Sequence, residues 1–339
     1  FFFKQKTAYE IRPRDSSSDV CSSDLAAKTA GETDVPPMLW AWVPITVFAA
    51  FAQTLRNAAQ RSLLDTLGTL GATLVRFLYG LPFAAAWLGL LLAVTDERPA
   101  PDWPTFAGWV TLGALCQIAG TALMLRVMAR RTFAVGVVYS NSELLQVALF
   151  GAVFLGDALT ALLVLAVILA TVGVVLISAQ RGLGGFAALL AGVRDGTALL
   201  GLLSGTAYGI AAVGFRGGAL SVADASAVVA AACALVAAQS LQTVLLGGWL
   251  LYRNPTTVAG TFAAWRVSLT AGFMGAAASA GWFTAMTLES VARVRTLGAI
   301  EIVFALVVSR RLFRERVSWL TLTGIALLGA GVVLIASGR

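Results

Sequence analysis

Long apolar runs separated by short polar breaks make up most of the chain after residue 38. A helix that crosses a bilayer needs about 20 mainly apolar residues, and about ten windows of this kind occur. Because the runs are continuous and do not alternate with polar residues, they favour helices over the strands of a membrane barrel. We therefore predict an all-α integral membrane protein. The predicted spans lie near 39–58, 69–94, 106–128, 133–154, 160–179, 198–219, 226–251, 266–288, 292–312 and 318–337.

Composition narrows the class of protein further. Hydrophobic residues make up 58% of the chain and charged residues 12%, whereas globular proteins carry roughly a quarter charged residues. There is no His, and outside the first 25 residues the only cysteines are Cys116 and Cys233, both in apolar runs. The commonest metal ligand and general base are thus missing, and no GxxxxGK[ST] nucleotide-binding loop occurs. We expect no metal, no cofactor and no enzymatic activity.

The first 25 residues differ from the rest of the chain. Back-translated, Lys4–Ile11 and Asp19–Leu25 resemble the two ends of an indexed sequencing-library adapter. A genuine acidic-basic tail is the alternative; a signal peptide is excluded because no apolar core follows the first lysines. Charges within the segment cancel, so the net charge of +7 belongs to the remaining chain. We predict that residues 1–25 are an artefact outside the fold.

The apolar region consists of two similar halves. At a shift of 158 positions Glu143 aligns with Glu301, Asp157 aligns with Glu315, and the segment GVVLI recurs. Two acid pairs with the same 14-residue spacing are stronger evidence than shared apolar residues. Five predicted spans per half is an odd number, so the second copy is inverted in the membrane, as in many secondary transporters. We assign residues 26–180 to repeat 1, 181–197 to a linker and 198–339 to repeat 2.

Arginines gather in alternate connections between the predicted spans. Arg130 and Arg131 precede the fourth span, and the run Arg310–Arg316 follows the ninth. If the second half is inverted, these connections lie on the same side of the membrane. The positive-inside rule assigns that side to the cytoplasm. With ten spans, both termini then lie in the periplasm. This use of arginine in short loops also argues against a nucleic-acid partner. The other arginines assigned to that side are Arg56, Arg61, Arg181, Arg194, Arg253 and Arg266.

Several short segments recur in a characteristic order. They are RFLYG from Arg76, MARRTFAVG from Met128, FLGD at Phe154–Asp157, ESVARV from Glu289 and LFRE at Leu312–Glu315. Over nearly all of residues 38–337 the chain resembles ten-helix members of the drug/metabolite transporter superfamily, which are built from two EamA domains. The resemblance implies transport. Two departures stand out. Leu144 follows Glu143 where the family often has Pro, and the first span has Gln53 and Thr54 but no acid, whereas small multidrug members couple to protons through a Glu in that span.

A polar stripe marks the best candidate for a substrate-lining surface. Tyr139, Ser142, Glu143 and Gln146 have i, i+3, i+4, i+7 spacing, so they share one helical face. A charged side chain at a helix centre costs at least about 2.5–3.5 kcal/mol on insertion scales, so it indicates function by default. The alternative is a structural acid: Glu143 would then pair with a neighbouring helix, with Arg76 as the candidate partner.

Two further charged residues lie inside spans. Arg76 is a candidate for binding a substrate carboxylate, although arginines near helix ends also snorkel to head groups. Glu301 has Leu297 and Phe304 on its own face, so its surroundings look apolar. We interpret Arg295, near the start of the ninth span, as a topological anchor, and Gln117, Tyr208, Gln239, Gln242 and Trp282 as residues that hydrogen-bond between helices or anchor at the interface.

Together these features predict a secondary transporter of the bacterial inner membrane. Arginine greatly exceeds lysine, and Lys28 is the only lysine outside the first 25 residues, which points to a GC-rich bacterial genome. Carboxylate and guanidinium candidates in one cavity suit a small polar or zwitterionic, amino-acid-like solute, and export by alternating access is the leading hypothesis. Protons are a candidate coupling partner, and the oligomeric state stays open. The alternatives are uptake of a larger metabolite or cofactor, and a non-transporting receptor or assembly partner.

Overall fold

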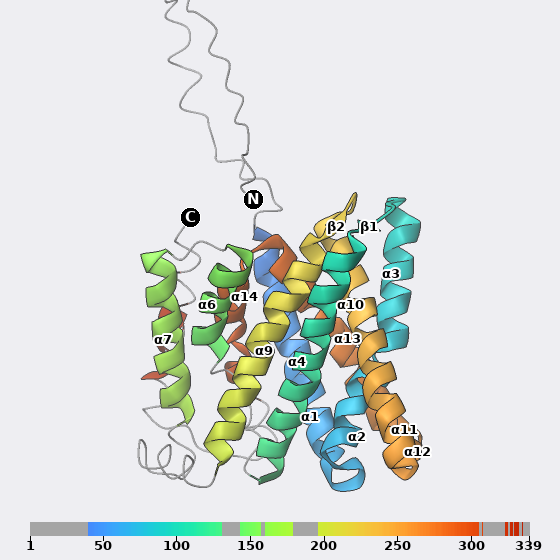
Figure 1. Ribbon diagram of the computed structural model, residues 1–339. Helices are drawn as coiled ribbons and strands as arrows, with labels where there is room; N and C mark the ends of the chain where they lie inside the picture. Colours follow the sequence, from blue (N-terminus) through green and yellow to red (C-terminus); the bar gives the residue numbers. More distant parts are fainter. Residues whose placement is uncertain are drawn as a thin grey trace, which may run out of the picture. The chain divides into compact units, whose positions relative to one another are not determined.

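The computed structural model describes residues 40–130, 143–156, 160–178 and 196–304, with scattered positions between 307 and 334. Almost all of these residues are helical (Figure 1), so the all-α class predicted from the sequence is confirmed. The adapter-like segment lies outside the described residues, as do Tyr139 and Ser142. Parts of the fourth and tenth predicted spans also fall outside, so the number of ten helices stays a prediction.

In the first half of the chain the predicted second span is divided into two helices. The first of them contains a kink at Gly68, whose φ of 65° is a backbone angle that glycine adopts readily. Pro82 stands in the first turn of the second helix, where its missing N–H is tolerated. The helices of this half are α1 (Trp42–Ser62), α2 (Leu64–Leu78), α3 (Leu81–Thr95), α4 (Trp103–Arg130), α6 (Glu143–Leu155) and α7 (Ala161–Ser178).

In the second half, the predicted seventh span runs through three helical segments without a loop. Ser226 caps its start, because its hydroxyl accepts a hydrogen bond from the backbone N–H of Val229 at 3.4 Å. A π-helical turn follows at Thr243–Gly247. The other helices of this half are α9 (Thr197–Leu220), α10 (Ala227–Gln242), α11 (Gly248–Arg253), α12 (Pro255–Ala263), α13 (Trp265–Leu288) and α14 (Val291–Gly298).

Membrane character follows from the length and apolarity of the helices. Four helical stretches among the described residues are long and apolar enough to cross a bilayer: Leu64–Thr95, Trp103–Ala129, Leu199–Leu220 and Ala227–Arg253. Large apolar side chains such as Val244 and Trp103 are exposed on the outer faces, at 69% and 67%. A lipid environment accounts for such exposure, because lipid tails impose no cost on apolar surface.

The predicted ninth span is not one continuous helix, which corrects the sequence-based expectation. α14 ends at Gly298, and the next amides bond three residues back: Ile300 to the carbonyl of Leu297 at 3.1 Å and Ile302 to that of Ala299 at 3.0 Å. A stretch of this tighter geometry inside a helix often marks a hinge. Glu301 is the first helical residue after the break.

Two very short strands lie outside the spans. β1 (Ala100–Pro101) pairs antiparallel with β2 (Val222–Ala223), and they join the α3–α4 connection to the α9–α10 connection. Both connections therefore lie at one end of the helices (Figure 1). This agrees with the predicted topology, in which the second and sixth connections between spans share a side.

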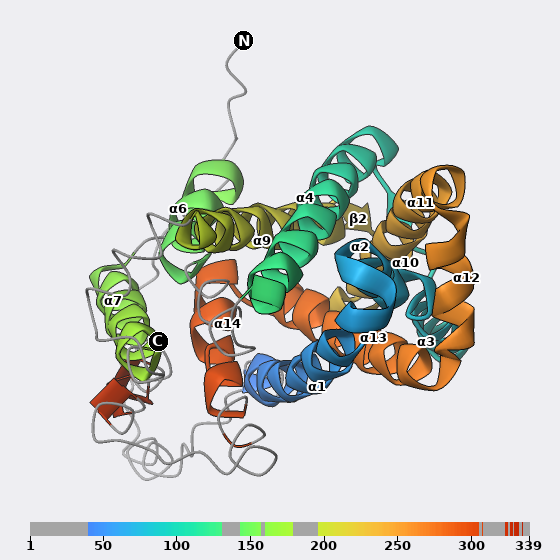
Figure 2. The same cartoon turned by 90° about the horizontal axis from the view of Figure 1, so that it is seen from below.

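Close helix pairs place the interior residues. α4 packs along α9 and α1 along α13, while α14 contacts both α1 and α6. Gly214 makes the first contact possible, since a Cβ atom there would lie 2.9 Å from the carbonyl oxygen of Trp109. Viewed from below, α1, α4, α9, α13 and α14 surround a common centre (Figure 2).

Candidate substrate pocket

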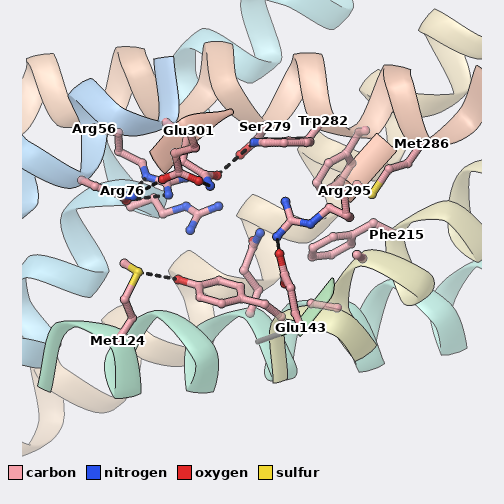
Figure 3. A pocket seen from close by; sticks show the side chains of 17 residues that line it. Arg56, Arg76, Met124, Glu143, Phe215, Ser279, Trp282, Met286, Arg295 and Glu301 are labelled. Atoms are coloured by element: carbon pink, nitrogen blue, oxygen red, sulfur yellow. Dashed lines mark hydrogen bonds and ion pairs between the residues drawn. The ribbon is translucent and has the colours of Figure 1, made fainter. Parts of the chain in front are cut away.

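A pocket lies among these helices. Its lining comes from both halves of the chain, from α1, α2, α4 and α6 and from α9, α13 and α14. The walls carry far more charge than is usual for the interior of a membrane protein, so a functional role is the default expectation. Among the described residues, the charged ones in its lining are Arg56, Arg76, Glu143, Arg295 and Glu301 (Figure 3).

Glu143 and Arg295 form an ion pair between the two halves. Glu143 is the first described residue of α6, and its Oε1 accepts a hydrogen bond from Nη2 of Arg295 on α14. The side chains are only 5% and 11% exposed. Arg295 also stacks over the ring of Trp282, with its guanidinium carbon 4.6 Å from the ring centroid. The second carboxylate oxygen, Oε2, is buried and has no hydrogen-bond partner among the described residues.

Glu301 is bound by two amide side chains of α1. Its Oε2 accepts from Nε2 of Gln53 at 2.6 Å, and its Oε1 accepts from Nδ2 of Asn57 at 2.9 Å. Gln53 in turn accepts a hydrogen bond from the indole N–H of Trp282 at 2.9 Å. Both carboxylate oxygens are therefore occupied, and the contact again joins the two halves.

Arg56 and Arg76 are buried, at 1% and 3% exposure. Arg56 donates to Oδ1 of Asn57 from Nε at 3.2 Å and from Nη2 at 2.7 Å, while its Nη1 has no partner among the described residues. Arg76 donates from Nη1 to the hydroxyl of Thr121 at 3.2 Å. Tyr208 donates to the same hydroxyl at 3.0 Å. Each arginine is thus held by a neutral acceptor.

An aromatic wall closes one side of the pocket. Phe215 of α9 and Phe283 of α13 stack with ring centroids 4.3 Å apart and an interplanar angle of 25°. Trp282 adjoins them, and Met124 and Met286 also line the space. The pocket therefore combines a charged region with an apolar one, as small-molecule sites usually do.

The structure brings together three of the residues proposed from the sequence. Glu143, Arg76 and Glu301 all line the pocket. Gln146 is half-buried on α6 and is not among the lining residues, and Tyr139 and Ser142 lie outside the described part of the chain. Whether any of these residues binds substrate stays a prediction.

Three interpretations of individual residues were wrong. Arg295 is not an anchor at the end of a span: it lies in the pocket and, rather than Arg76, is the partner of Glu143. Arg56 is not in a cytoplasmic connection, because α1 continues to Ser62 and buries it. The surroundings of Glu301 are polar, since α1 supplies the partners that its own helix lacks.

A sequence signal for the missed residues did exist. Gln53, Arg56, Asn57 and Gln60 have the same i, i+3, i+4, i+7 spacing as the stripe around Glu143. Because the first span was predicted to end near residue 58, Arg56 was grouped with the arginines of the cytoplasmic side, and this face was not recognised. The expected interhelical hydrogen bonds are present between Gln117 and Gln242 at 2.8 Å, from Tyr208 to Thr121 at 3.0 Å and from Trp282 to Gln53 at 2.9 Å. Gln117, Tyr208 and Trp282 also line the pocket.

No group of His, Cys, Asp or Glu suited to hold a metal ion occurs in the ranges that the structure describes. Fold and pocket together define an all-α integral membrane protein with a charged cavity between two sets of helices.

Comparison with known proteins agrees with this class. Residues 196–337 match the EamA-like transporter family, so an EamA-like transporter domain occupies the second half of the chain and the resemblance to the drug/metabolite transporter superfamily is confirmed. EamA-like proteins are membrane transporters rather than enzymes. The match does not extend to the first half, so the assignment of repeat 1 stays a prediction.

Solved structures support the fold over most of the chain. Among 26 matching chains, one, titled only as the crystal structure of a protein, has a TM-score of 0.64 and 19% sequence identity. The match covers 88% of this chain and 96% of that one. At this identity the likeness concerns the fold alone. A search of curated protein sequences found no match.

Proposed function

We propose that this chain is a secondary transporter of the bacterial inner membrane that exports a small polar or zwitterionic, amino-acid-like metabolite by alternating access. The observation that carries the proposal is the pocket. Five charged side chains from both halves of a membrane protein meet there, and two of their polar atoms have no partner among the described residues. In lipid such groups persist where they serve a function.

The two unpartnered atoms suit the two ends of an amino acid. Oε2 of Glu143 is a buried acceptor and fits an ammonium group, while Nη1 of Arg56 is a buried donor and fits a carboxylate. A ligand that bound both would remove the desolvation cost of leaving them unpaired. The stacked rings of Phe215 and Phe283 offer an apolar surface to the rest of the solute.

Alternating access is supported by the way contacts cross between the halves. Glu143 belongs to the first half and binds Arg295 of the second, whereas Glu301 belongs to the second half and binds Gln53 and Asn57 of the first. These reciprocal contacts are expected if residues 26–180 and 198–339 are inverted repeats about the pocket. Rocking of one half against the other would break and remake them, with the break after Gly298 as a hinge.

Export and proton coupling belong to the same proposal. Glu143 is the candidate proton carrier, because one of its oxygens has no partner among the described residues and both of Glu301's are bound. Release of the solute would then follow a change in the charge of the carboxylate that binds its ammonium group.

The test is flux in proteoliposomes with a panel of labelled amino acids and related metabolites. We expect at least one member to move in exchange for an unlabelled internal pool. Glu143→Gln should abolish that flux. The matched control is Glu289→Gln, which removes an acid paired with Arg293 at 3.3 Å, outside the pocket lining. Binding of a metabolite without flux would contradict transport and favour a receptor.

A further inference from the structure

Arg56 and Arg76 are two buried cations without a carboxylate partner among the described residues. Their hydrogen bonds go to the amide oxygen of Asn57 and the hydroxyl of Thr121. Neither acceptor carries a charge. A buried charge that is not neutralised is costly, so a pair of such groups needs an explanation other than stability.

The two side chains lie over the same residue of α13. A Cβ atom built on Gly275 would lie 3.3 Å from Cδ of Arg56 and 3.5 Å from Cγ of Arg76. Glycine at this position therefore leaves room for both side chains to pass, one from α1 and one from α2. Figure 3 shows both arginines on the same side of the pocket, next to Glu301.

Among the described residues that line the pocket, positive charges exceed negative charges by one. These residues supply three guanidinium groups and two carboxylates. Arg295 is neutralised by Glu143 directly, and Arg56 is linked to Glu301 through the amide of Asn57. Arg76 has no corresponding acid among the residues described. A solute of zero net charge leaves this excess in place, whereas a solute with one net negative charge removes it.

We infer that Arg56 and Arg76 form an anion seat over Gly275 that binds a carboxylate of the transported solute, and that this solute carries one more negative than positive charge, as an acidic amino acid does. Two guanidinium groups side by side present several donors to one oxyanion, and such charge-assisted hydrogen bonds are the strong ones. Glu143 remains available for the ammonium group. The inference rests on the proposed transport of an amino-acid-like solute through this pocket.

The experiment measures binding separately from transport. Purified protein in nanodiscs of zwitterionic phosphatidylcholine is titrated by calorimetry with L-glutamate, L-glutamine and L-lysine, which differ in net charge but little in size. Without anionic lipid, no lipid head group of net negative charge competes for the seat. The variants are Arg76→Gln, Arg76→Lys and Gly275→Ala, with Arg253→Gln, at the exposed end of α11, as the control.

We expect glutamate to bind at least tenfold more tightly than glutamine, and lysine to bind least. Arg76→Gln should remove this preference, and Arg76→Lys should restore part of it, which separates charge from folding. Gly275→Ala keeps both charges, and its Cβ would lie 3.3 Å from Cδ of Arg56, which must shift slightly, so we expect a smaller loss of glutamate binding than in Arg76→Gln. Arg253→Gln should bind as the unchanged protein does.

Equal binding of glutamate and glutamine, an unchanged preference in Arg76→Gln, or no binding of glutamate would each overturn the anion seat. The two proposals fail in different ways. If glutamate binds with the expected preference but no panel member moves in proteoliposomes, transport is contradicted and the seat stands. If solutes move without regard to their charge, the seat alone is contradicted.

Discussion

Breaking the ion pair between Glu143 and Arg295 should reveal a strong energetic coupling between the two halves of the protein. The pair is almost fully desolvated, with side chains 5% and 11% exposed. Two charges about 4 Å apart attract by about 4 kcal/mol at an effective dielectric constant of 20. Removing one partner of such a pair costs about 3–5 kcal/mol, because the other charge stays buried.

The two single variants should differ from each other. In Glu143→Gln the guanidinium of Arg295 keeps its contact with the ring of Trp282 at 4.6 Å. A desolvated cation–π contact contributes about 2 kcal/mol, so we expect the loss of unfolding free energy to fall at the low end of the range for a broken buried pair. In Arg295→Gln the carboxylate of Glu143 has no comparable contact among the described residues, so this variant should lose more unfolding free energy. The double variant leaves no unpaired charge, so its loss should be smaller than the sum of the single losses by about 2 kcal/mol or more.

The assay is equilibrium unfolding in mixed detergent micelles, followed by tryptophan fluorescence, on the four members of the cycle. The same cycle on Arg293 and Glu289, an ion pair with side chains 23% and 18% exposed, is the control and should give a coupling below about 1 kcal/mol. If the loss of unfolding free energy in the double variant equals the sum of the two single losses within about 0.5 kcal/mol, Glu143 and Arg295 do not act as a buried pair and the reasoning is refuted.

Three further predictions concern other parts of the chain. A protein that begins near Met38, and so lacks residues 1–25, should insert into the membrane as the full chain does. Finding the codons for residues 1–25 in source DNA would contradict the artefact interpretation. A C-terminal alkaline phosphatase fusion should be active and a C-terminal green fluorescent protein fusion dark, because both termini are predicted to be periplasmic; the reverse pair would invert the topology. Gly298→Ala should destabilise by about 1–3 kcal/mol, since its Cβ would clash with Cη2 of Trp282. Gly89→Ala, with nothing within 4 Å of the added Cβ, should be neutral or stabilising.

Membrane class and the approximate positions of most spans could be predicted from the sequence because apolar length is a local property. The predicted eighth span, 266–288, differs from α13 by one residue at its start. Breaks inside spans were harder to foresee. The break after Gly298 lies inside a predicted span, and no Pro or polar loop marks it in the sequence.

The pocket could be predicted only in part. Glu143 and Glu301 stand out because acids inside spans are rare, and the repeat relates them to each other. The partners of Glu301 could not be read from its own helix, since they come from α1, more than two hundred residues away along the chain. Arg295 looked like an anchor because position near the start of a span says nothing about which neighbouring helix it faces.

The central claim is that the transported solute passes through this pocket and that transport depends on the carboxylate of Glu143. The measurement is the initial rate of solute flux in proteoliposomes across a pH gradient, at matched protein amounts, for Glu143→Gln, Glu301→Gln and the control Glu289→Gln. Glu143 has one oxygen without a partner among the described residues, whereas both oxygens of Glu301 are bound by amides. We therefore expect Glu143→Gln to abolish flux, Glu301→Gln to reduce it less, and Glu289→Gln to leave it unchanged. Unchanged flux in Glu143→Gln, or a greater loss in Glu301→Gln, would contradict the claim and return Glu143 to a structural role.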